Sequence, residues 1–479
     1  MSEKRPNIIM IMSDDHGAWA IGYENHEIIT PNLDRLCDEG VQFRNFFCTS
    51  PVCSPARASV LTGRTPSAHG VQDWISGGND KEHPIEYLDG QLCYTDVLDE
   101  NGYNCLLSGK WHLGASFQPQ HSFKEWYTHL KGSGDYNNAP MIRDGELDIR
   151  PGEYVTDLIT DDAIRNIDKY AEKDEPFYLS VHYTAPHSPW IDMHPKEFTD
   201  LYQDCPFETC PQGTPHPQAV YVYDRELARQ CLIGYFAAVT AMDAGIGRIL
   251  DHLEEKGLRE DTFIIFLADN GFCCGHHGVW GKGCGTLDLN LYDTSCKVPC
   301  IISWPSKIAK GQVSDAMLSQ YDIFPTLLEV AGIEWHPGQY QPGSSFLPII
   351  DGRHEEQDKD VVIYDEYGPV RMIHDQRYKY VHRYPYGPHE FYDLEKDPGE
   401  CFNYIDDARY QDIILAMRGR LREWFARYTD PRVDGVYEPN RGNGQLCRPG
   451  VYSNGKIAFD PNRKRNSTQG WSGDVKDSK

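Results

Sequence analysis

Several features are missing from this chain of 479 residues, and each absence excludes a class of protein. No apolar run approaches about 18 residues, so we expect neither a membrane-spanning helix nor a membrane partner. The first apolar run, residues 7–12, is too short for the centre of a secretory signal peptide, and two aspartates soon follow it. We therefore expect a cytoplasmic protein, with export as the alternative if a signal has been removed.

Basic residues are also scarce. The chain has 46 Lys and Arg against 72 Asp and Glu, and its net charge of −26 argues against nucleic acid as a partner. Its 15 cysteines include no C-x-x-C pair, which excludes the usual zinc sites and indicates mostly reduced thiols in a reducing compartment. With 40% hydrophobic and 12% aromatic residues, the chain is globular and long enough for one large core and a smaller second one.

The order of apolar segments predicts the fold class. Buried-strand patterns, such as residues 7–12 and 262–268, alternate with helical patterns, such as 53–61 and 223–256. This alternation is typical of an α/β sheet that is covered by helices on both faces. No internal repeat interrupts it.

Three parts of the chain differ in composition. We assign residues 1–355 to one α/β domain, which ends where the sequence turns polar. Residues 356–440 contain three short strand patterns and a helical pattern, and form a C-terminal subdomain. Residues 441–479 are rich in Gly, Asn, Arg and Lys, which indicates an extended tail.

The most informative segment runs from Cys53 to Arg57, with the sequence C-S-P-A-R, and T-G-R closes it at residues 62–64. Taken alone, Cys53 is best explained as a small buried apolar residue. Arg57 lies one helical turn further on, so its guanidinium can neutralise charge beside position 53. The C-x-P-x-R spacing and the T-G-R ending resemble the sulfatase signature. In that family the cysteine is oxidised to formylglycine, whose hydrate attacks sulfur through one hydroxyl and later expels sulfate through the other.

Polar residues follow two of the predicted strands. Asp14 and Asp15 end the first, and Asp269 and Asn270 end the second. Such oxygen donors at strand ends suit a metal site and favour calcium or magnesium over zinc, although polar strand-end turns are common without a metal. In sulfatases these segments carry the metal ligands. The resemblance therefore implies that the four residues hold Ca²⁺, or alternatively Mg²⁺, together with the modified Cys53.

A third motif, G-K-W-H-L-G, covers residues 109–114. Lys110 and His112 are two apart, so their side chains face one way on an extended segment. The motif matches its sulfatase counterpart throughout. The resemblance implies that Lys110 helps to hold sulfate, and that His112 contacts the nucleophile and acts as the base when sulfate is expelled.

Two more residues take roles from the resemblance. The segment A-P-H-S-P at residues 185–189 is similar to one whose histidine faces the leaving group, which makes His187 the candidate general acid. After Asp269 the family places a lysine that contacts sulfate, and Lys282 fits this position, with Lys297 as the alternative.

The substrate is less well indicated. Gln72, Asp73 and Trp74 follow the segment of Cys53, where they can contact a sugar ring and its hydroxyls. Arg371 and His374 can reach a carboxylate or a second sulfate. Each of these residues is otherwise explained by packing or by a surface position. We favour a sulfated carbohydrate, with a small aryl or alkyl sulfate as the alternative.

The resemblance extends from about residue 7 to 403. It implies an alkaline-phosphatase-like fold, with a large mixed, mostly parallel sheet between helices and a smaller antiparallel sheet in a C-terminal subdomain. The implied function is a sulfuric ester hydrolase that a formylglycine-generating enzyme must mature. A phosphodiester or phosphonate monoester hydrolase and a non-catalytic sulfoglycan-binding protein are the alternatives, and the oligomeric state stays open.

Overall fold

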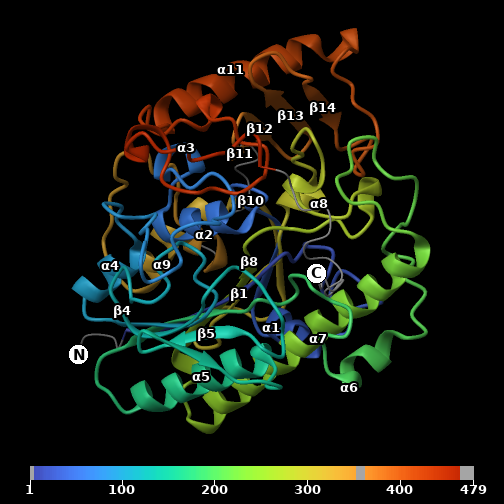
Figure 1. Cartoon of the computed structure of the whole chain (residues 1–479). Helices are drawn as coiled ribbons and strands as arrows, with labels where there is room; N and C mark the ends of the chain where they lie inside the picture. Colours follow the sequence, from blue (N-terminus) through green and yellow to red (C-terminus); the bar gives the residue numbers. More distant parts are fainter. Residues whose placement is uncertain (1–4, 352–361, 464–479) are drawn as a thin grey trace.

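Two β-sheets organise the chain. The computed structural model describes residues 5–351 and 362–463. Ten strands form one large sheet, and four form a smaller sheet at one end of the molecule (Figure 1). The strands of the large sheet are β1 (Asn7–Ser13), β2 (Val41–Phe47), β3 (Asn104–Gly109), β4 (Phe123–His129), β5 (Pro140–Arg143), β6 (Glu146–Ile149), β7 (Phe177–His182), β8 (Thr262–Ala268), β9 (Cys300–Ser303) and β10 (Gln312–Ser319). Those of the small sheet are β11 (Ile363–Tyr367), β12 (Val370–His374), β13 (Tyr378–Arg383) and β14 (Glu390–Asp393).

The large sheet is mixed but mostly parallel. Its strand order is β10-β2-β9-β8-β1-β7-β3-β4-β5-β6. β1 runs parallel to β7 and β8, and β3 runs parallel to β7 and β4. β9 is antiparallel to both of its neighbours, and so is β5. The predicted fold class is therefore confirmed.

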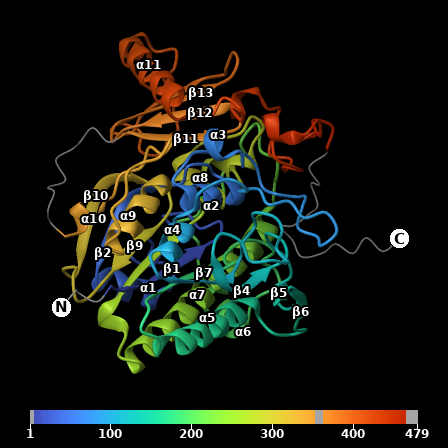
Figure 2. The same cartoon turned by 90° about the vertical axis from the view of Figure 1, so that its left-hand side faces the viewer.

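Helices cover both faces of this sheet. The α-helices are α1 (Pro31–Asp38), α2 (Cys53–Thr62), α3 (Pro66–His69), α4 (Tyr94–Glu100), α5 (Val155–Ala171), α6 (Lys196–Thr199), α7 (Arg225–Glu255), α8 (Asp293–Cys296), α9 (Ile323–Val330), α10 (Leu347–Ile350) and α11 (Gln411–Tyr428). In Figures 1 and 2, α5 and α7 lie on one face, and α2, α4 and α9 lie on the other. Each face has its own apolar cluster, so the sheet is buried between two helical layers.

Helix α7 is the main element of one layer. Asp224 caps it by accepting a hydrogen bond from the backbone N–H of Leu227 at 2.8 Å. By length and composition α7 could cross a membrane, but most of its apolar stretch is buried inside the protein, including Phe236, Met242 and Ile246. Core packing therefore accounts for the apolar composition of this helix.

The smaller sheet shares its core with the larger one. Tyr367 and Met372 belong to the apolar cluster that also includes residues of β2 and α2. On its other face Ile373 packs with Met417 and Leu421 of α11. All four strands pair antiparallel, as predicted. The predicted boundary at residue 355 lies outside the described residues.

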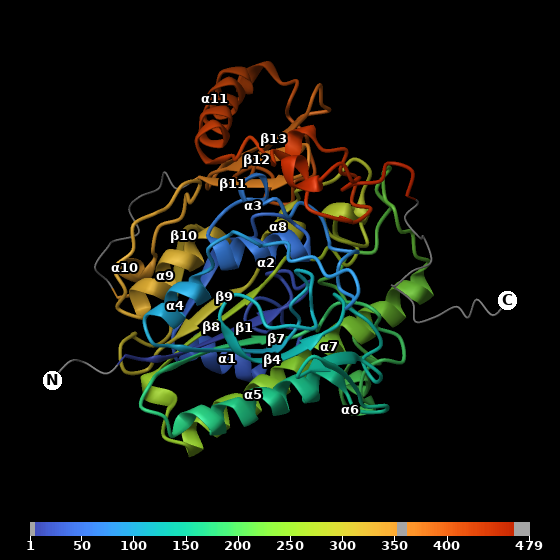
Figure 3. The same ribbon diagram turned by 60° about the vertical axis from the view of Figure 1, so that its left-hand side comes forward.

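The described part of the predicted tail is ordered against the rest of the chain. Residues 441–463 contain one 3₁₀ turn, Gly450–Ser453. They lie beside the loop that follows α3 (Figure 3). Residues 464–479 of the predicted tail lie outside the described residues.

Candidate active site

The parallel strands bring distant polar residues to one edge of the large sheet. Asp14 and Asp15 follow β1, and Asp269 and Asn270 follow β8, its neighbour. Lys110 follows β3, which is joined to β1 through β7. The carboxyl ends of parallel strands meet at one edge, which is where ligands bind in open α/β sheets.

Cys53 lies at this edge as the first residue of α2. Its side chain is buried, and burial raises the pKa of the thiol above its ordinary value. The Sγ atom lies 3.4 Å from Nδ1 of His112. The backbone N–H groups in the first turn of a helix attract negative charge, so this position suits an anion.

His112 is held on its other side by a backbone carbonyl. Its Nε2 lies 3.1 Å from the carbonyl oxygen of Ile75, and a carbonyl only accepts, so Nε2 carries a proton. Burial, then the charges of Lys110 and Arg57, lower the pKa of His112 well below its ordinary value. The ring is therefore neutral, and the unprotonated Nδ1 faces Cys53.

The backbone around His112 differs from the prediction. β3 ends at Gly109, so Lys110 and His112 do not share an extended segment, and His112 has a φ of 55°. The two side chains still converge on the site. A positive φ is uncommon for a residue other than glycine and occurs often where a side chain has a functional position.

Buried carboxylates form a cluster beside Cys53. One oxygen each of Asp14 and Asp269 and the Sγ of Cys53 lie within 4.8 Å of one another. The atoms of a second group, one oxygen each of Asp14 and Asp15 and a ring nitrogen of His187, also lie within 4.8 Å of one another. Asn270 donates from Nδ2 to Oδ1 of Asp15 at 2.8 Å.

Three cations pair with these carboxylates. Lys110 bonds Asp14 and Lys282 bonds Asp15 through their ammonium groups, and Arg57 donates to Asp269 at 2.8 Å. Although burial favours the neutral acids, Lys110 and Lys282 hold the pKa values of Asp14 and Asp15 below the ordinary value. Burial and the charge of Asp14 raise the pKa of Asp269.

The donor set fits a hard divalent cation. Three buried oxygens have no hydrogen-bond partner within the described residues: Oδ1 of Asp14, Oδ2 of Asp15 and Oδ1 of Asn270. A buried acceptor without a partner is costly, and a cation would satisfy all three. Carboxylate and amide oxygens suit calcium or magnesium.

His187 lies at the margin of this cluster. Its Nε2 is 3.6 Å from Oδ2 of Asp15, and its Nδ1 is 2.7 Å from the carbonyl oxygen of Ser188. Of the two candidate lysines, Lys282 is buried against Asp15. Lys297 follows α8, and its charge acts on Asp293 and His374 instead.

Gln72, Asp73 and Trp74, which were predicted to bind substrate, contact other residues of the protein. The buried Gln72 donates to the carbonyl oxygen of Val433. The buried Asp73 accepts from the hydroxyl of Tyr367 at 2.6 Å. The indole of Trp74 lies 5.3 Å from the guanidinium of Arg463. All three side chains therefore contact distant parts of the chain.

The two predicted substrate residues of β12 are buried as well. Arg371 donates to Asp434 at 2.6 Å and to Ser67 at 3.0 Å. The ring of His374 lies edge-on to Phe47, with 4.9 Å between the ring centres. Both side chains therefore link the small sheet to other parts of the protein.

Three features of the site escaped the sequence prediction. The first is the bond from His112 to the carbonyl of Ile75, a backbone group that any residue type could supply. Gly132 approaches the ring of His112, where a Cβ atom would lie 2.2 Å from Cε1. His129 is buried at the end of β4, and the charges of Lys110 and His187 act on it. The G-S-G sequence at 132–134 was the one available signal, because paired glycines often mark a close backbone approach.

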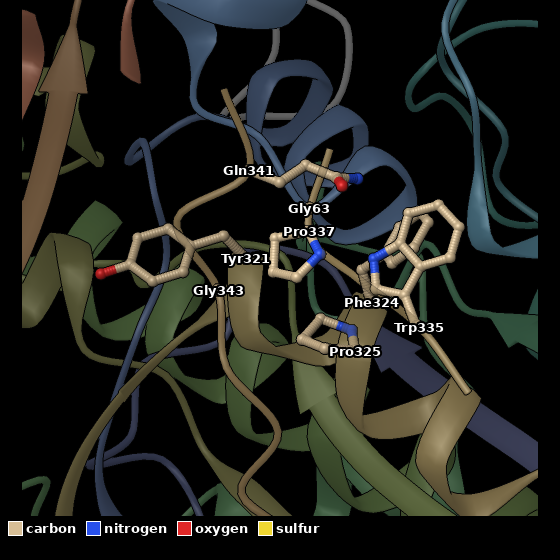
Figure 4. A pocket seen from close by; sticks show the side chains of 8 residues that line it. All are labelled: Gly63, Tyr321, Phe324, Pro325, Trp335, Pro337, Gln341 and Gly343. Carbon is tan, nitrogen blue, oxygen red and sulfur yellow. The ribbon is translucent and has the colours of Figure 1, made fainter. Parts of the chain in front are cut away.

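A small pocket lies at the other end of α2 (Figure 4). Gly63, Phe324, Trp335 and Gln341 are among its lining residues. Its volume of about 10 Å³ is enough for one water molecule only. This pocket is therefore too small for a substrate.

Comparisons with known proteins agree with this geometry. The family model described as sulfatase matches residues 6–333, and that described as N-sulphoglucosamine sulphohydrolase, C-terminal, matches residues 275–427. An N-acetylglucosamine-6-O-sulfatase of Bacteroides thetaiotaomicron is 28% identical over 90% of this chain and 88% of its own length. A choline-sulfatase of Rhizobium meliloti is 28% identical over 90% of each chain.

A solved structure supports the same assignment. It shows a protein in complex with its substrate D-glucosamine-2-N,6-O-disulfate, and it superimposes with a TM-score of 0.76 at 25% identity. The match covers 91% of this chain and 100% of the other. Since the family match spans more than half of the sequence and includes the segment of Cys53 and the polar residues at both strand ends, the chain belongs to the sulfatase family of sulfuric ester hydrolases.

Proposed function

We propose that this protein releases inorganic sulfate from a sulfated carbohydrate, with formylglycine at position 53 and a bound Ca²⁺ ion. The observation that carries the proposal is the position of Cys53 at the start of α2, 3.4 Å from Nδ1 of His112 and within 4.8 Å of two buried carboxylates. Formylglycine at this position would supply an oxygen nucleophile as a hydrated aldehyde.

The side chains around position 53 have complementary tasks. Arg57, Lys110 and Lys282 place positive charge where the sulfate oxygens would lie. His112 can accept a proton at Nδ1, because Ile75 keeps the other nitrogen protonated. His187 lies at the margin and would give a proton to the leaving oxygen.

Four residues would hold the cation. Asp14, Asp15, Asp269 and Asn270 offer hard oxygen donors, and three of the four have an oxygen that accepts no hydrogen bond from the described residues. When bound, the ion would neutralise charge on the sulfate and the nucleophile. We prefer Ca²⁺ to Mg²⁺ from the family resemblance. A rise in melting temperature on adding Ca²⁺ to chelator-treated protein would test binding without relying on turnover.

The substrate class rests on the relatives. One relative is named for an N-acetylglucosamine sulfate, and one solved neighbour holds a sulfated glucosamine as its substrate. The choline-sulfatase is equally similar, so an alkyl sulfate is the alternative. We further propose a cytoplasmic location and maturation by a formylglycine-generating enzyme, which must reach Cys53 before folding buries it. The fifteen free cysteines support a reducing compartment.

The decisive experiment is sulfate release by protein that has been co-expressed with a maturation enzyme. The substrates are mono- and disaccharides that are each sulfated at one defined position, together with choline sulfate. Mass spectrometry of the tryptic peptide 45–57 measures conversion of Cys53. We expect release from one saccharide and none from the Cys53→Ala variant.

Other outcomes separate the alternatives. Release from choline sulfate alone would replace the carbohydrate proposal. With formylglycine present but no sulfate released, turnover of phosphonate monoesters or phosphodiesters would indicate the related hydrolases. An unmodified Cys53 under these conditions would remove the nucleophile and favour a sulfoglycan-binding protein.

A further inference from the structure

Gln445 is a buried glutamine that lies far in sequence from every residue of the site. It belongs to the C-terminal segment 440–463, which lies against residues 70–76 (Figure 3). These residues form the loop after α3 and contain neither an α-helix nor a ladder strand. Their backbone groups therefore need partners from elsewhere in the chain.

Gln445 supplies these partners with its backbone. Its N–H donates to the carbonyl of Trp74 at 2.8 Å, and its carbonyl accepts from the N–H of Ser76 at 3.0 Å. These two bonds pair Gln445 with Ile75 in an isolated parallel bridge. Ile75 is thus fixed from both of its neighbours.

The side chain of Gln445 extends the same contact. Its Oε1 accepts from the N–H groups of Gln72 at 2.8 Å and Asp73 at 3.3 Å. Its Nε2 donates to the carbonyls of Gly70 and Cys447, both at 3.0 Å. The amide uses both of its N–H donors and both acceptor positions of its oxygen. A single side chain therefore supplies hydrogen bonds that a neighbouring strand would otherwise give to this loop.

Ile75 connects this contact to the chemistry. Its carbonyl accepts from Nε2 of His112 at 3.1 Å, which leaves Nδ1 facing Cys53. Its N–H donates to the hydroxyl of Ser54, the residue next to Cys53, at 3.1 Å. Ile75 therefore has contacts with both the candidate base and the helix that carries the nucleophile.

We propose that Gln445 is a positioning residue for the sulfatase reaction. It holds the loop 70–76 so that the Ile75 carbonyl fixes the His112 ring in the Nε2-protonated form, with Nδ1 toward position 53. The expected effect on turnover rests on the function proposed above. The expected tautomer of His112 rests on the contacts alone. Through Gln445, the C-terminal segment therefore helps to hold the active site in its geometry.

The test compares Gln445→Leu with Gln341→Leu. Gln341 is a matched control, because it is also a buried glutamine whose amide bonds two backbone groups, Thr62 and Gly338, at 2.8 and 2.7 Å. It lies at the far end of α2 (Figure 4). Both variants lose buried hydrogen bonds, so both are expected to be less stable.

We expect the two variants to differ in turnover. Gln445→Leu should lower kcat by about 10- to 100-fold with little change in KM, because a supporting contact that orients a catalytic histidine has about this effect. Gln341→Leu should keep kcat within about threefold. In a His112→Ala background, Gln445→Leu should cause no further loss, because it acts through that ring. Formylglycine content is measured in every sample, so that loss of maturation is not read as loss of turnover.

A second measurement does not need turnover. The ¹⁵N spectrum of labelled histidine, assigned with His112→Ala, should show one tautomer of His112 in the unsubstituted protein and in Gln341→Leu. Gln445→Leu should show a mixture of tautomers. Identical spectra for the two glutamine variants, or equal kcat values, would overturn the positioning role. A protein that releases no sulfate at all, yet shows the tautomer difference, would overturn the proposed function and leave the positioning contact supported.

Discussion

Gly132 gives the sharpest test of how the candidate base is held. A Cβ atom at this position would lie 2.2 Å from Cε1, 2.5 Å from Nδ1 and 2.6 Å from Nε2 of His112. Carbon atoms in contact need about 3.5 Å, so Gly132→Ala requires the ring or the loop to move by roughly 1.3 Å. The ring is fixed by Ile75 on one side and faces Cys53 on the other. Movement of the ring therefore takes Nδ1 away from the nucleophile.

The expected loss follows from this displacement. A misplacement of about 1 Å in a catalytic group costs about 100-fold in rate, or about 2.7 kcal/mol of transition-state stabilisation. The assay is kcat for sulfate release from the best saccharide, divided by the fraction of protein that carries formylglycine. The melting temperature is recorded as well, because the backbone can move instead of the ring.

Gly134→Ala is the matched control. It lies two residues further along the same loop, and the nearest atom to its Cβ would be Nε2 of His129 at an ordinary 3.6 Å. We expect its kcat to stay within about threefold of the unsubstituted protein. Should Gly132→Ala retain full turnover at equal formylglycine content, the ring of His112 would not need its present position, and the reasoning would be refuted.

Three other predictions concern single side chains. Lys282→Met should reduce kcat/KM by more than 100-fold, because it removes a buried cation beside Asp15. Lys297→Met should reduce kcat/KM less than tenfold. The reverse order would identify Lys297 as the sulfate-contacting lysine. His187→Ala should slow sugar sulfates by at least about tenfold more than 4-nitrophenyl sulfate, because a good leaving group does not need the acid; equal losses would argue against that role. Burial lowers the pKa values of His69 and His194 to about 3, so the folded state resists protonation that the unfolded chain accepts near its ordinary pKa of 6.5. The stability should therefore fall as the pH decreases below about 6.5 toward 3, and a melting temperature that stays constant between about pH 7 and 4.5 would contradict this.

The grouping of Cys53 with the strand-end acids could be predicted because each of them belongs to a continuous local pattern. The C-x-P-x-R segment and the strand-end acids need only the alternation of strands and helices to bring them together. Fold class followed from the same alternation. The positions of Asp14 and Asp269 at adjacent strand ends are a direct consequence of the parallel pairing of β1 and β8.

Residues 72–74 show where sequence reasoning stops. Gln72, Asp73 and Trp74 have the side chains that bind sugars, and the same amide, carboxylate and indole groups also bond to backbone. The choice between these uses depends on Val433 and Tyr367, which lie about 300 or more residues away along the chain. No local pattern encodes such a contact, and for the same reason the Ile75 carbonyl could not be anticipated.

The charge of the protein also has to be reconciled with an anionic substrate. The chain as a whole has a net charge of −26, which repels a sulfate ester. Inside the site, three buried carboxylates face three buried cations, so the protein alone offers the substrate no surplus of positive charge. A divalent cation on the three oxygens that accept no hydrogen bond within the described residues would supply that surplus at the proposed sulfate site. The segment 440–463, with four basic residues against one aspartate, lies beside the loop of Ile75 and adds positive charge near the same edge. A sulfate ester would therefore be attracted by the local field of the proposed cation and of the C-terminal segment, against the field of the molecule as a whole.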